Sequence, residues 1–207
     1  MKVTRVEAVT KTKYKVFLDE QFAFELYKGE LSRYQIAEGA QISETIYEMI
    51  RQEVILKRIK LRALHLLNVS DRTEADLRNK LRQSHYPEDL IEEAVAYVKR
   101  FGYINDERYV QMYVLNRKEK KSRREIYAAL LQKGIPGEQI DEAFESCYDQ
   151  EDALEAICTL LSKKGYRPDM DENQKQKLYG YLARKGFGMK KFVMQWRFLV
   201  GMKEVSD

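Results

Sequence analysis

The sequence has few residues that break helices and no long apolar run. Only 3 prolines and 10 glycines occur among 207 residues. These two residue types disfavour a helix interior most strongly, so their scarcity favours long helices. The longest uninterrupted apolar run, Ile126 to Leu131, is far shorter than the about 20 residues that a membrane-spanning helix needs. The first ten residues, MKVTRVEAVT, also lack the apolar segment of a signal peptide, so we expect a cytoplasmic protein without a membrane span.

Residues that carry chemistry are also scarce. The chain has 2 histidines, 2 cysteines and 1 tryptophan, and it has no phosphate-binding loop, dinucleotide fingerprint or metal-ligand spacing. Cys147 and Cys158 fall in helical patterns, so we expect two reduced, buried thiols rather than a disulfide. We expect no enzyme activity, no cofactor and no metal, although a site built only from carboxylates and lysines stays open.

An apolar pattern recurs three times in the chain. Its apolar residues lie at offsets of 0, 4, 9, 14, 18 and 21 from starting points that are 49 and 52 residues apart. Such a spacing is typical of stacked helical units. The three sets are Leu77, Leu81, Tyr86, Ile91, Val95 and Val98, then Ile126, Leu130, Ile135, Ile140, Phe144 and Cys147, then Leu178, Leu182, Phe187, Phe192, Trp196 and Leu199.

Helix-start residues repeat in register with this pattern. Thr73 and Ser122 each precede a carboxylate by three residues, at Asp76 and Glu125, which is the arrangement of a capped helix start. The third copy lacks this hydroxyl. Either its helix starts earlier, near Asp171, or that copy has diverged.

Helix-break residues repeat as well. Pro87 and Pro136 coincide and are expected just inside the start of a helix, where a missing N–H costs nothing. Gly134 and Gly186 coincide at the preceding break, where a left-handed residue ends a helix. His85 holds that place in the first copy, and histidine tolerates the left-handed region better than most residues.

Each copy is preceded by a further apolar helical segment, at 61–67, 109–115 and 154–161. The sequence therefore predicts a mainly α protein with three tandem three-helix repeats, stacked into a curved, elongated body. We expect the chain to be a monomer. The predicted segments are 1–43 as an N-terminal β extension, 44–104 as the first repeat with a long leading helix, 105–150 as the second repeat and 151–207 as the third.

The first 27 residues follow a period of two. Tyr14, Val16 and Leu18 alternate with other residues, and a second alternating run begins at Phe22. Asp19 and Glu20 lie between the runs, so a β-hairpin is expected. Residues 3–9 could add a third strand, which gives a small sheet that we expect to lie on the first helices.

From Glu44 the pattern becomes helical. One broad face is predicted to be apolar, and a basic face opposite to it is predicted to be solvated. The apolar set is Ile46, Met49, Ile50, Val54, Leu61, Leu64 and Leu67, and the basic set is Arg51, Lys57, Arg58, Lys60 and Arg62.

Charge is segregated along the chain although the net charge is only +4. Residues 99–133 hold 10 basic and 4 acidic side chains, 134–161 hold no basic and 8 acidic ones, and 162–203 hold 11 basic and 3 acidic ones. Repeats stacked in register would align the basic segments, and aligned cations attract a polyanion. The candidate DNA- or partner-binding residues are Arg117, Lys118, Lys120, Lys121, Arg123, Arg124, Lys163, Lys164, Arg184, Lys185, Lys190 and Lys191.

Three linked segments resemble a known family. They are TEADLRNKL at 73–81, GYINDERYV at 102–110 and KSRREIYAALLQKGIPGEQIDEAF at 121–144. Together they resemble the bacterial RecX family of recombinase regulators, over roughly 53–200. The resemblance implies a protein that binds the filament of RecA recombinase on single-stranded DNA and limits strand exchange and the coupled ATP hydrolysis. It also implies roles in DNA repair, recombination and the SOS response.

Two other functions remain open from the residues themselves. The first is a stand-alone, sequence-nonspecific nucleic-acid-binding protein, for which binding to single-stranded DNA would be tight rather than weak. The second is a protein adaptor without DNA binding. The acidic residues between 138 and 155 are expected to form a solvated face, or a docking face for a basic partner surface.

Overall fold

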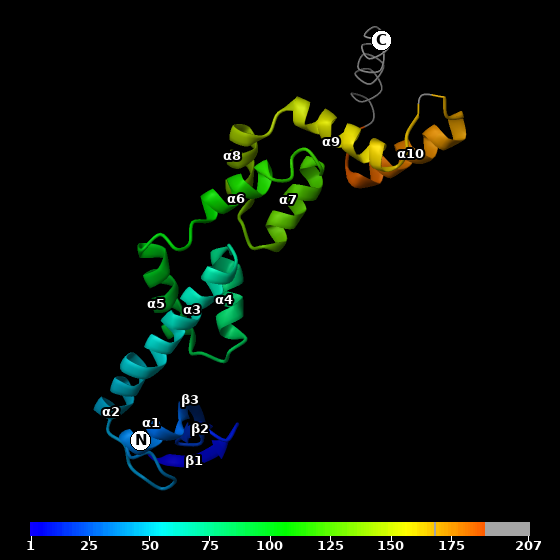
Figure 1. Cartoon of the computed structure of the whole chain (residues 1–207). Coiled ribbons are helices and arrows are strands. Elements are labelled where there is room, and N and C mark those ends of the chain that lie inside the picture. The colour runs from blue at the N-terminus through cyan, green and yellow to red at the C-terminus, as the bar shows by residue number, and fades with distance from the viewer. Residues whose placement is uncertain (168, 189–207) are drawn as a thin grey trace. The chain divides into compact units, whose positions relative to one another are not determined.

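The structure is a computed structural model that describes residues 1–167 and 169–188. Its residues form two compact units, Met1–Ile104 and a second unit from Asn105 onward, and each is described by itself. Helices dominate both units, as Figure 1 shows. A three-stranded sheet stands at the N-terminus, so the predicted mainly α class with a small N-terminal sheet is confirmed.

The N-terminal sheet is antiparallel and has the order β1-β2-β3. Its strands are β1 (Val3–Ala8), β2 (Lys13–Leu18) and β3 (Gln21–Tyr27). The turn between β2 and β3 consists of Asp19 and Glu20, with φ angles of 46° and 70°. Positive φ at both residues matches the right-handed twist of a two-residue hairpin. The predicted hairpin and the third strand are both confirmed.

One face of this sheet is buried against the helices of the same unit. The alternating residues Val16, Leu18, Phe24 and Leu26 are buried in one apolar core with helix residues such as Ile50. Alternation places these four side chains on the same face. The sheet therefore lies on the first helices, as expected.

Six helical segments follow in the first unit. The prediction of a helix from Glu44 is confirmed, because Ser43 caps that helix with its side chain. Two of the six segments were not predicted from the sequence, a short helix inside the predicted β extension and a π-helical segment. The segments are α1 (Lys28–Arg33), α2 (Glu44–Met49), the π-helix η1 (Ile50–Leu56), α3 (Lys57–Val69), α4 (Glu74–Arg82) and α5 (Glu88–Arg100).

The π-helix explains why the predicted apolar face was partly wrong. Its hydrogen bonds join residues i and i+5, so each turn holds more residues than an α-turn and the later side chains rotate to another face. Leu61, predicted to be buried and located after the π-helix, is 59% exposed. Met49, also predicted to be buried, lies before the π-helix and is 41% exposed, which the π-helix does not explain. The buried residues of this run are Ile50, Ile55, Leu56, Ile59, Ala63 and Leu66.

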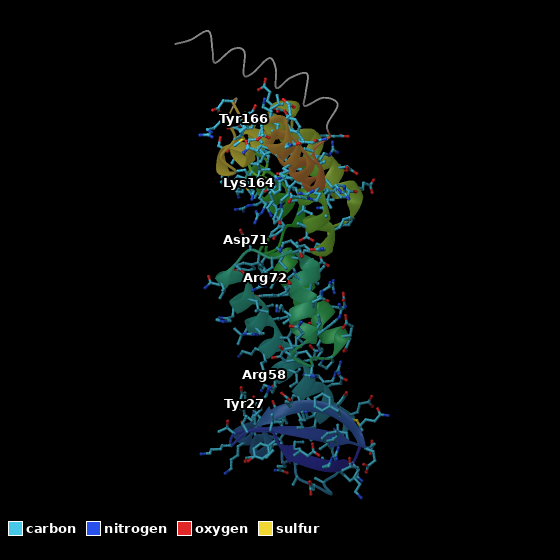
Figure 2. All side chains as sticks on the ribbon, turned by 90° about the vertical axis from the view of Figure 1, so that its right-hand side faces the viewer. Tyr27, Arg58, Asp71, Arg72, Lys164 and Tyr166 are labelled. Carbon is cyan, nitrogen blue, oxygen red and sulfur yellow. The ribbon has the colours of Figure 1, made fainter. Side chains whose placement is uncertain are left out.

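Arg58 lies on the predicted solvated face but joins the sheet to α3. Its guanidinium donates to the Glu25 carbonyl at 2.8 Å and to both carboxylate oxygens of Glu30 at 2.8 and 2.7 Å. It also lies 4.8 Å from the centre of the Tyr27 ring, and Figure 2 shows Tyr27 and Arg58 together where the sheet meets the helices. For Arg58 the prediction of a solvated side chain is therefore wrong.

The second unit contains five described helices. Each of the three predicted leading segments lies within a helix, in α3, α6 and α9. Asn105 caps the first helix of this unit by accepting from the Arg108 N–H at 2.9 Å. The five are α6 (Asp106–Leu115), α7 (Arg123–Gln132), α8 (Gly137–Cys147), α9 (Gln150–Lys163) and α10 (Glu172–Lys185).

The repeated apolar residues are core residues. In repeat 1 (α3, α4 and α5) and repeat 2 (α6, α7 and α8) they are buried, except that Tyr86 and Cys147 are partly buried. In repeat 3 (α9, α10 and the chain after them), Leu182 and Phe187 are buried and Leu178 packs beside them. Three members of the third set, Phe192, Trp196 and Leu199, lie outside the described residues.

The repeated helix starts are also confirmed. Thr73 accepts the Asp76 N–H at 3.1 Å, and Ser122 accepts the Glu125 N–H at 3.1 Å. In repeat 3 the cap is Asp171, so the alternative in which this helix starts earlier is correct.

The helix breaks have the predicted left-handed backbone. The φ angle is 57° at His85, 79° at Gly134 and 96° at Gly186. Pro87 and Pro136 are the residues just before the first helical residue, one position earlier than predicted. Because a proline has no N–H, it fits either place at a helix start.

Candidate nucleic-acid interface

The basic run from Arg117 to Arg124 lies between α6 and α7. The structure places most of it in the turns of residues 116–121, and only Arg123 and Arg124 belong to α7. Ser122, which caps α7, is buried with 1% of its surface exposed. The run is therefore a connection held at both ends by helices, and its side chains differ in their surroundings.

Lys118 has an acidic partner within the protein. Its ammonium lies 3.0 Å from Asp152 Oδ1, and the Asp152 side chain is only 8% exposed. The hydrogen bond to Asp152 raises the pKa of Lys118 above the ordinary lysine value. Asp152 also accepts the backbone N–H of Asp149 at 2.8 Å. Lys118 thus neutralises a buried carboxylate at the start of α9, which links repeat 2 to repeat 3.

Two arginines of the run also have partners within the protein. The Arg117 guanidinium lies 3.8 Å from the centre of the Tyr113 ring. Arg123 forms an ion pair with Asp141 at 3.3 Å and lies 4.7 Å from the centre of the Phe144 ring. Both side chains of the Arg123–Asp141 pair are about half exposed, so solvent screens this interaction and the arginine is only weakly held.

The remaining cations of the run are exposed. Lys120, Lys121 and Arg124 have no ion pair with any residue in the described part of the chain. An unpaired surface cation keeps its full charge for an incoming anion. In these three residues of the predicted run, no acidic side chain of the described residues neutralises the charge.

The predicted residues of repeat 3 divide in the same way. Lys163, Lys164 and Arg184 are exposed and make no ion pair within residues 1–167 and 169–188. Lys164, labelled in Figure 2, lies 5.0 Å from the centre of the Tyr181 ring. Lys185 instead forms an ion pair with Glu125 at 2.8 Å. Lys190 and Lys191 lie outside the described residues.

The end of α10 contacts the start of α7. The Ser122 hydroxyl donates to the Lys185 carbonyl at 2.5 Å, and the Lys185 ammonium donates to Glu125 Oε1 at 2.8 Å. Gly186 lies against Arg124, because a Cβ added at Gly186 would be 2.9 Å from Arg124 Cβ. The structure therefore places Arg124 and Arg184 at one junction although they are far apart in sequence.

We call six residues the unpaired basic set. Its members are exposed, are predicted ligand contacts and have no ion pair among the described residues. Four of them lie next to residues of the α7–α10 contact: Lys120 and Lys121 precede Ser122, Arg124 lies against Gly186, and Arg184 precedes Lys185. Lys164 lies beside Tyr181, one turn before Lys185, and Lys163 precedes Lys164 at the end of α9. The set is Lys120, Lys121, Arg124, Lys163, Lys164 and Arg184.

The acidic segment also contributes structural contacts that the sequence analysis did not assign. Asp141 and Asp152 form the ion pairs with basic residues described above, and Asp149 caps α9 by accepting the Asp152 N–H at 3.0 Å. Glu138 and Glu142 on α8 are exposed and have no ion pair within the part of the chain that the structure describes. The expectation of a uniformly solvated acidic face is therefore wrong for Asp152.

The described residues contain no group of three or more His, Cys, Asp or Glu side chains that could hold a metal ion. Cys147 and Cys158 are free thiols, and they are partly rather than fully buried. None of the described helices has the length and apolar character needed to cross a membrane.

Three family models match consecutive parts of the chain. The first three-helix domain of RecX matches residues 60–97, the second matches 105–143 and the third matches 150–190. The boundaries of α3 to α10 fall close to these ranges. The prediction of three tandem three-helix repeats is confirmed.

Curated relatives and a solved structure are similar over most of the chain. The regulatory protein RecX of Caldanaerobacter subterraneus subsp. tengcongensis is 33% identical over 90% of this chain and 94% of that protein. The regulatory protein RecX of Clostridium perfringens is 28% identical over 90% of each. A crystal structure of a regulatory protein RecX is 27% identical, has a TM-score of 0.61, and matches over 93% of this chain and 97% of that chain. Because this last match covers 93% of the chain, it includes at least part of the N-terminal sheet.

Proposed function

The chain belongs to the RecX family, and from this premise we propose that it regulates a RecA-type recombinase. In this proposal it binds the filament that the recombinase forms on single-stranded DNA. Binding limits strand exchange and the coupled ATP hydrolysis. The relatives are named as regulatory proteins, which supports a regulatory rather than a catalytic role.

The observation that carries the proposal is the unpaired basic set in the second unit. A regulator of a nucleoprotein filament needs a surface that prefers a polyanion, and cations without acidic partners supply one. The exposed glutamates of α8, such as Glu138 and Glu142, could contact basic surfaces of the recombinase in the same complex.

The mechanism that we propose is insertion of repeats 2 and 3 into the helical groove of the filament. There they bridge neighbouring recombinase subunits. A bridge of this kind occupies the path of the incoming duplex and opposes the subunit motions that ATP hydrolysis requires.

A titration of the protein into a mixture of recombinase, ATP and single-stranded DNA tests this function. We expect inhibition of ATP hydrolysis at amounts well below one molecule per recombinase, because one bridge restrains several subunits. Absence of inhibition at every ratio would contradict the proposal.

A stand-alone nucleic-acid-binding protein is the second candidate, and the unpaired basic set supports it too. It predicts tight binding to bare DNA that weakens steeply with salt, and no specific effect on the recombinase. A pure protein adaptor predicts instead no DNA binding, and no effect of reversing the charges of Lys120, Lys121, Arg123 and Arg124. Binding to bare oligonucleotides, measured beside the hydrolysis assay, separates the three.

A further inference from the structure

Two lysines of the predicted binding site connect repeats 2 and 3. Lys118, after α6, pairs with Asp152 at the start of α9, and Lys185, at the end of α10, pairs with Glu125 in the first turn of α7. In each pair one partner comes from repeat 2 and the other from repeat 3. The hydrogen bond to Glu125 also raises the pKa of Lys185 above its ordinary value. Both ammonium groups are therefore engaged by carboxylates of the protein.

Gly186 allows the two repeats to approach closely at one of these connections. Its φ of 96° is a left-handed conformation, and an added Cβ would lie 2.9 Å from both Cβ and Cδ of Arg124 and 3.2 Å from the Ser122 hydroxyl. Contacts under 3.0 Å require a shift of the neighbouring atoms. A side chain at this position would therefore push the end of α10 away from α7.

Arg184 precedes Lys185 in the last turn of α10, so the contacts of Lys185 hold the end of α10 that carries Arg184 at the start of α7. Tyr181 lies one turn before Lys185, and Lys164 of α9 packs against the Tyr181 ring. The contact between Ser122 and the Lys185 carbonyl joins this group to Lys120 and Lys121. Loss of the α7–α10 contact would leave two smaller groups of cations in place of one.

We propose that the unpaired basic set is a single surface for the phosphate backbone of a single-stranded nucleic acid, and that Glu125, Lys185 and Gly186 assemble this surface without touching the ligand. The choice of ligand rests on the proposed function. The assignment of Lys185 as a positioning residue reverses the role that the sequence suggested for it.

The surroundings of the set favour nucleic acid over an acidic protein surface. Protein interfaces have an apolar core, whereas interfaces with nucleic acids are dominated by charge. The described residues with exposed large apolar side chains include none from 116–124 and none from 162–167 or 169–188. A ligand at this surface would therefore meet polar and charged side chains rather than an apolar patch, which suits a chain of phosphates.

Glu125→Gln distinguishes assembly from simple charge attraction, because the two predict opposite signs. Glutamine can keep the capping-box contact to the Ser122 N–H, but it removes one negative charge and the ion pair with Lys185. Simple attraction predicts tighter binding to a polyanion. Assembly predicts weaker binding with a smaller salt dependence, since contacts from Lys164 and Arg184 are lost. Losing two phosphate contacts lowers the salt slope by about 1.4.

The charge-swapped double variant Glu125→Lys with Lys185→Glu tests the same connection by rescue. It has the net charge of the wild type and restores an ion pair in which the acidic and basic positions are exchanged. We expect it to recover most of the affinity that Lys185→Gln loses. Failure of the swap to bind better than Lys185→Gln, with both variants folded by circular dichroism, would overturn the assembly role.

Gly186→Ala tests the close approach, and Gly165→Ala is its matched control. Both glycines have positive φ, 96° and 70°, so the backbone penalty is similar. An added Cβ at Gly165 has nothing within 4 Å, unlike the one at Gly186. We expect Gly186→Ala to weaken oligonucleotide binding by about tenfold and to flatten its salt dependence, whereas Gly165→Ala keeps wild-type binding. Equal binding of the two variants would contradict the inference.

Binding is measured by fluorescence anisotropy of a labelled oligothymidine at several salt concentrations, with the full chain and no recombinase. If the wild type does not bind the oligothymidine at low salt, the inference is wrong, whatever the hydrolysis assay gives. If the wild type binds it as expected but does not inhibit ATP hydrolysis by the recombinase, the inference stands and the proposed function fails. The two failures are therefore separable.

Discussion

Repeats 1 and 2 share a core pattern but use their basic residues differently. In repeat 1, Arg78 pairs with Glu74 and Glu92, Arg82 pairs with Glu88, and Lys99 pairs with Glu74. In repeat 2, Lys120, Lys121 and Arg124 have no acidic partner among the described residues. The ion-paired residues of repeat 1 therefore contrast with these three of repeat 2, although repeat 1 also has exposed cations without an ion pair among the described residues, at Lys57, Arg62, Lys80 and Arg100.

This difference shows that the number of basic residues does not locate a binding surface. Repeat 1 is rich in arginine, yet Arg58, Arg72, Arg78 and Arg82 each lie against a carboxylate of the protein. A paired cation has lost much of its attraction for a ligand, because the carboxylate screens its field. The position of the acidic residues therefore decides which cations remain without a partner in the protein.

The largest expected effect tests what the repeats have in common. Leu81→Ala and Leu130→Ala change equivalent core positions, both 0% exposed. We expect each to lower the free energy of unfolding of its own unit by about 2–5 kcal/mol, because each leaves a cavity. Leu131→Ala, at a position 48% exposed, is the control and should change it by less than about 0.5 kcal/mol. Urea unfolding measures all three, and a small effect at only one of the core positions would show that the two cores are not equivalent.

The second largest expected effect is a loss of stability of the first unit when Arg58, which has hydrogen-bond partners in that unit, is replaced. Arg58→Ala removes the hydrogen bonds to Glu25 and Glu30, and we expect it to destabilise the unit by about 1–3 kcal/mol. Arg62→Ala, one turn later at an exposed position, should change stability by less than about 0.5 kcal/mol. Thermal unfolding compares them. Equal unfolding temperatures for the two variants would mean that Arg58 does not anchor the sheet.

A charge-reversal experiment tests the difference between the repeats directly. The triple variant Lys120→Glu, Lys121→Glu and Arg124→Glu should keep its stability but lower the salt slope of oligothymidine binding by about 2, since each phosphate contact contributes about 0.7.

Arg78→Glu in repeat 1 is the matched control for this experiment. It should reduce stability, because it places a carboxylate beside Glu74 and Glu92, and it should leave the salt slope unchanged. Equal loss of oligothymidine affinity in the triple variant and in Arg78→Glu would contradict this difference between the repeats.

The smallest expected effect is on pH dependence. Hydrogen bonds from Lys99 and then Arg78 lower the pKa of Glu74 below its ordinary value of 4.5. The resulting stabilisation is present above pH 4.5 and is lost as the pH falls through the lowered pKa. Glu74→Gln should therefore flatten the acid side of the stability curve of the first unit, as followed by circular dichroism. If Glu74→Gln leaves the loss of stability at acid pH unchanged, Glu74 does not contribute to that loss.

The ion pairs Lys118–Asp152 and Lys185–Glu125 of the second unit should lose their stabilising effect only at high pH. Carboxylate partners raise the pKa values of Lys118 and Lys185 above 10.5. The stabilisation from a raised lysine pKa is complete below pH 10.5 and is lost only as the pH rises through the raised value. Both ion pairs should therefore be intact at neutral pH. Gly186→Ala should weaken oligothymidine binding to the same extent throughout the neutral pH range.

Local patterns allowed much of the fold to be predicted. The period of two in the first 27 residues predicted the sheet, and the repeated caps Thr73 and Ser122 predicted helix starts. These features depend on neighbours within a few residues, which a sequence displays directly. The π-helix at Ile50–Leu56 could not be predicted in this way. Its wider turn depends on how the side chains around it pack, and this moved Leu61 to the surface.

The candidate site was predicted only in part for a related reason. Charge runs identified all six members of the unpaired basic set, together with Lys118 and Lys185. Nothing local separates these two lysines from the others, since their partners Asp152 and Glu125 are far away in sequence. The exposed Glu138 and the buried Asp152 likewise belong to one acidic segment and differ only in three dimensions.

The sequence by itself determined the helical repeats, their caps and their cores, because helix periodicity and capping act over one or two turns. Only the tertiary structure decided which cations keep their charge for a ligand. An ion pair forms between side chains that the fold brings within about 4 Å, and for Lys185 and Glu125 that proximity follows from the close approach of α10 to α7 at Gly186.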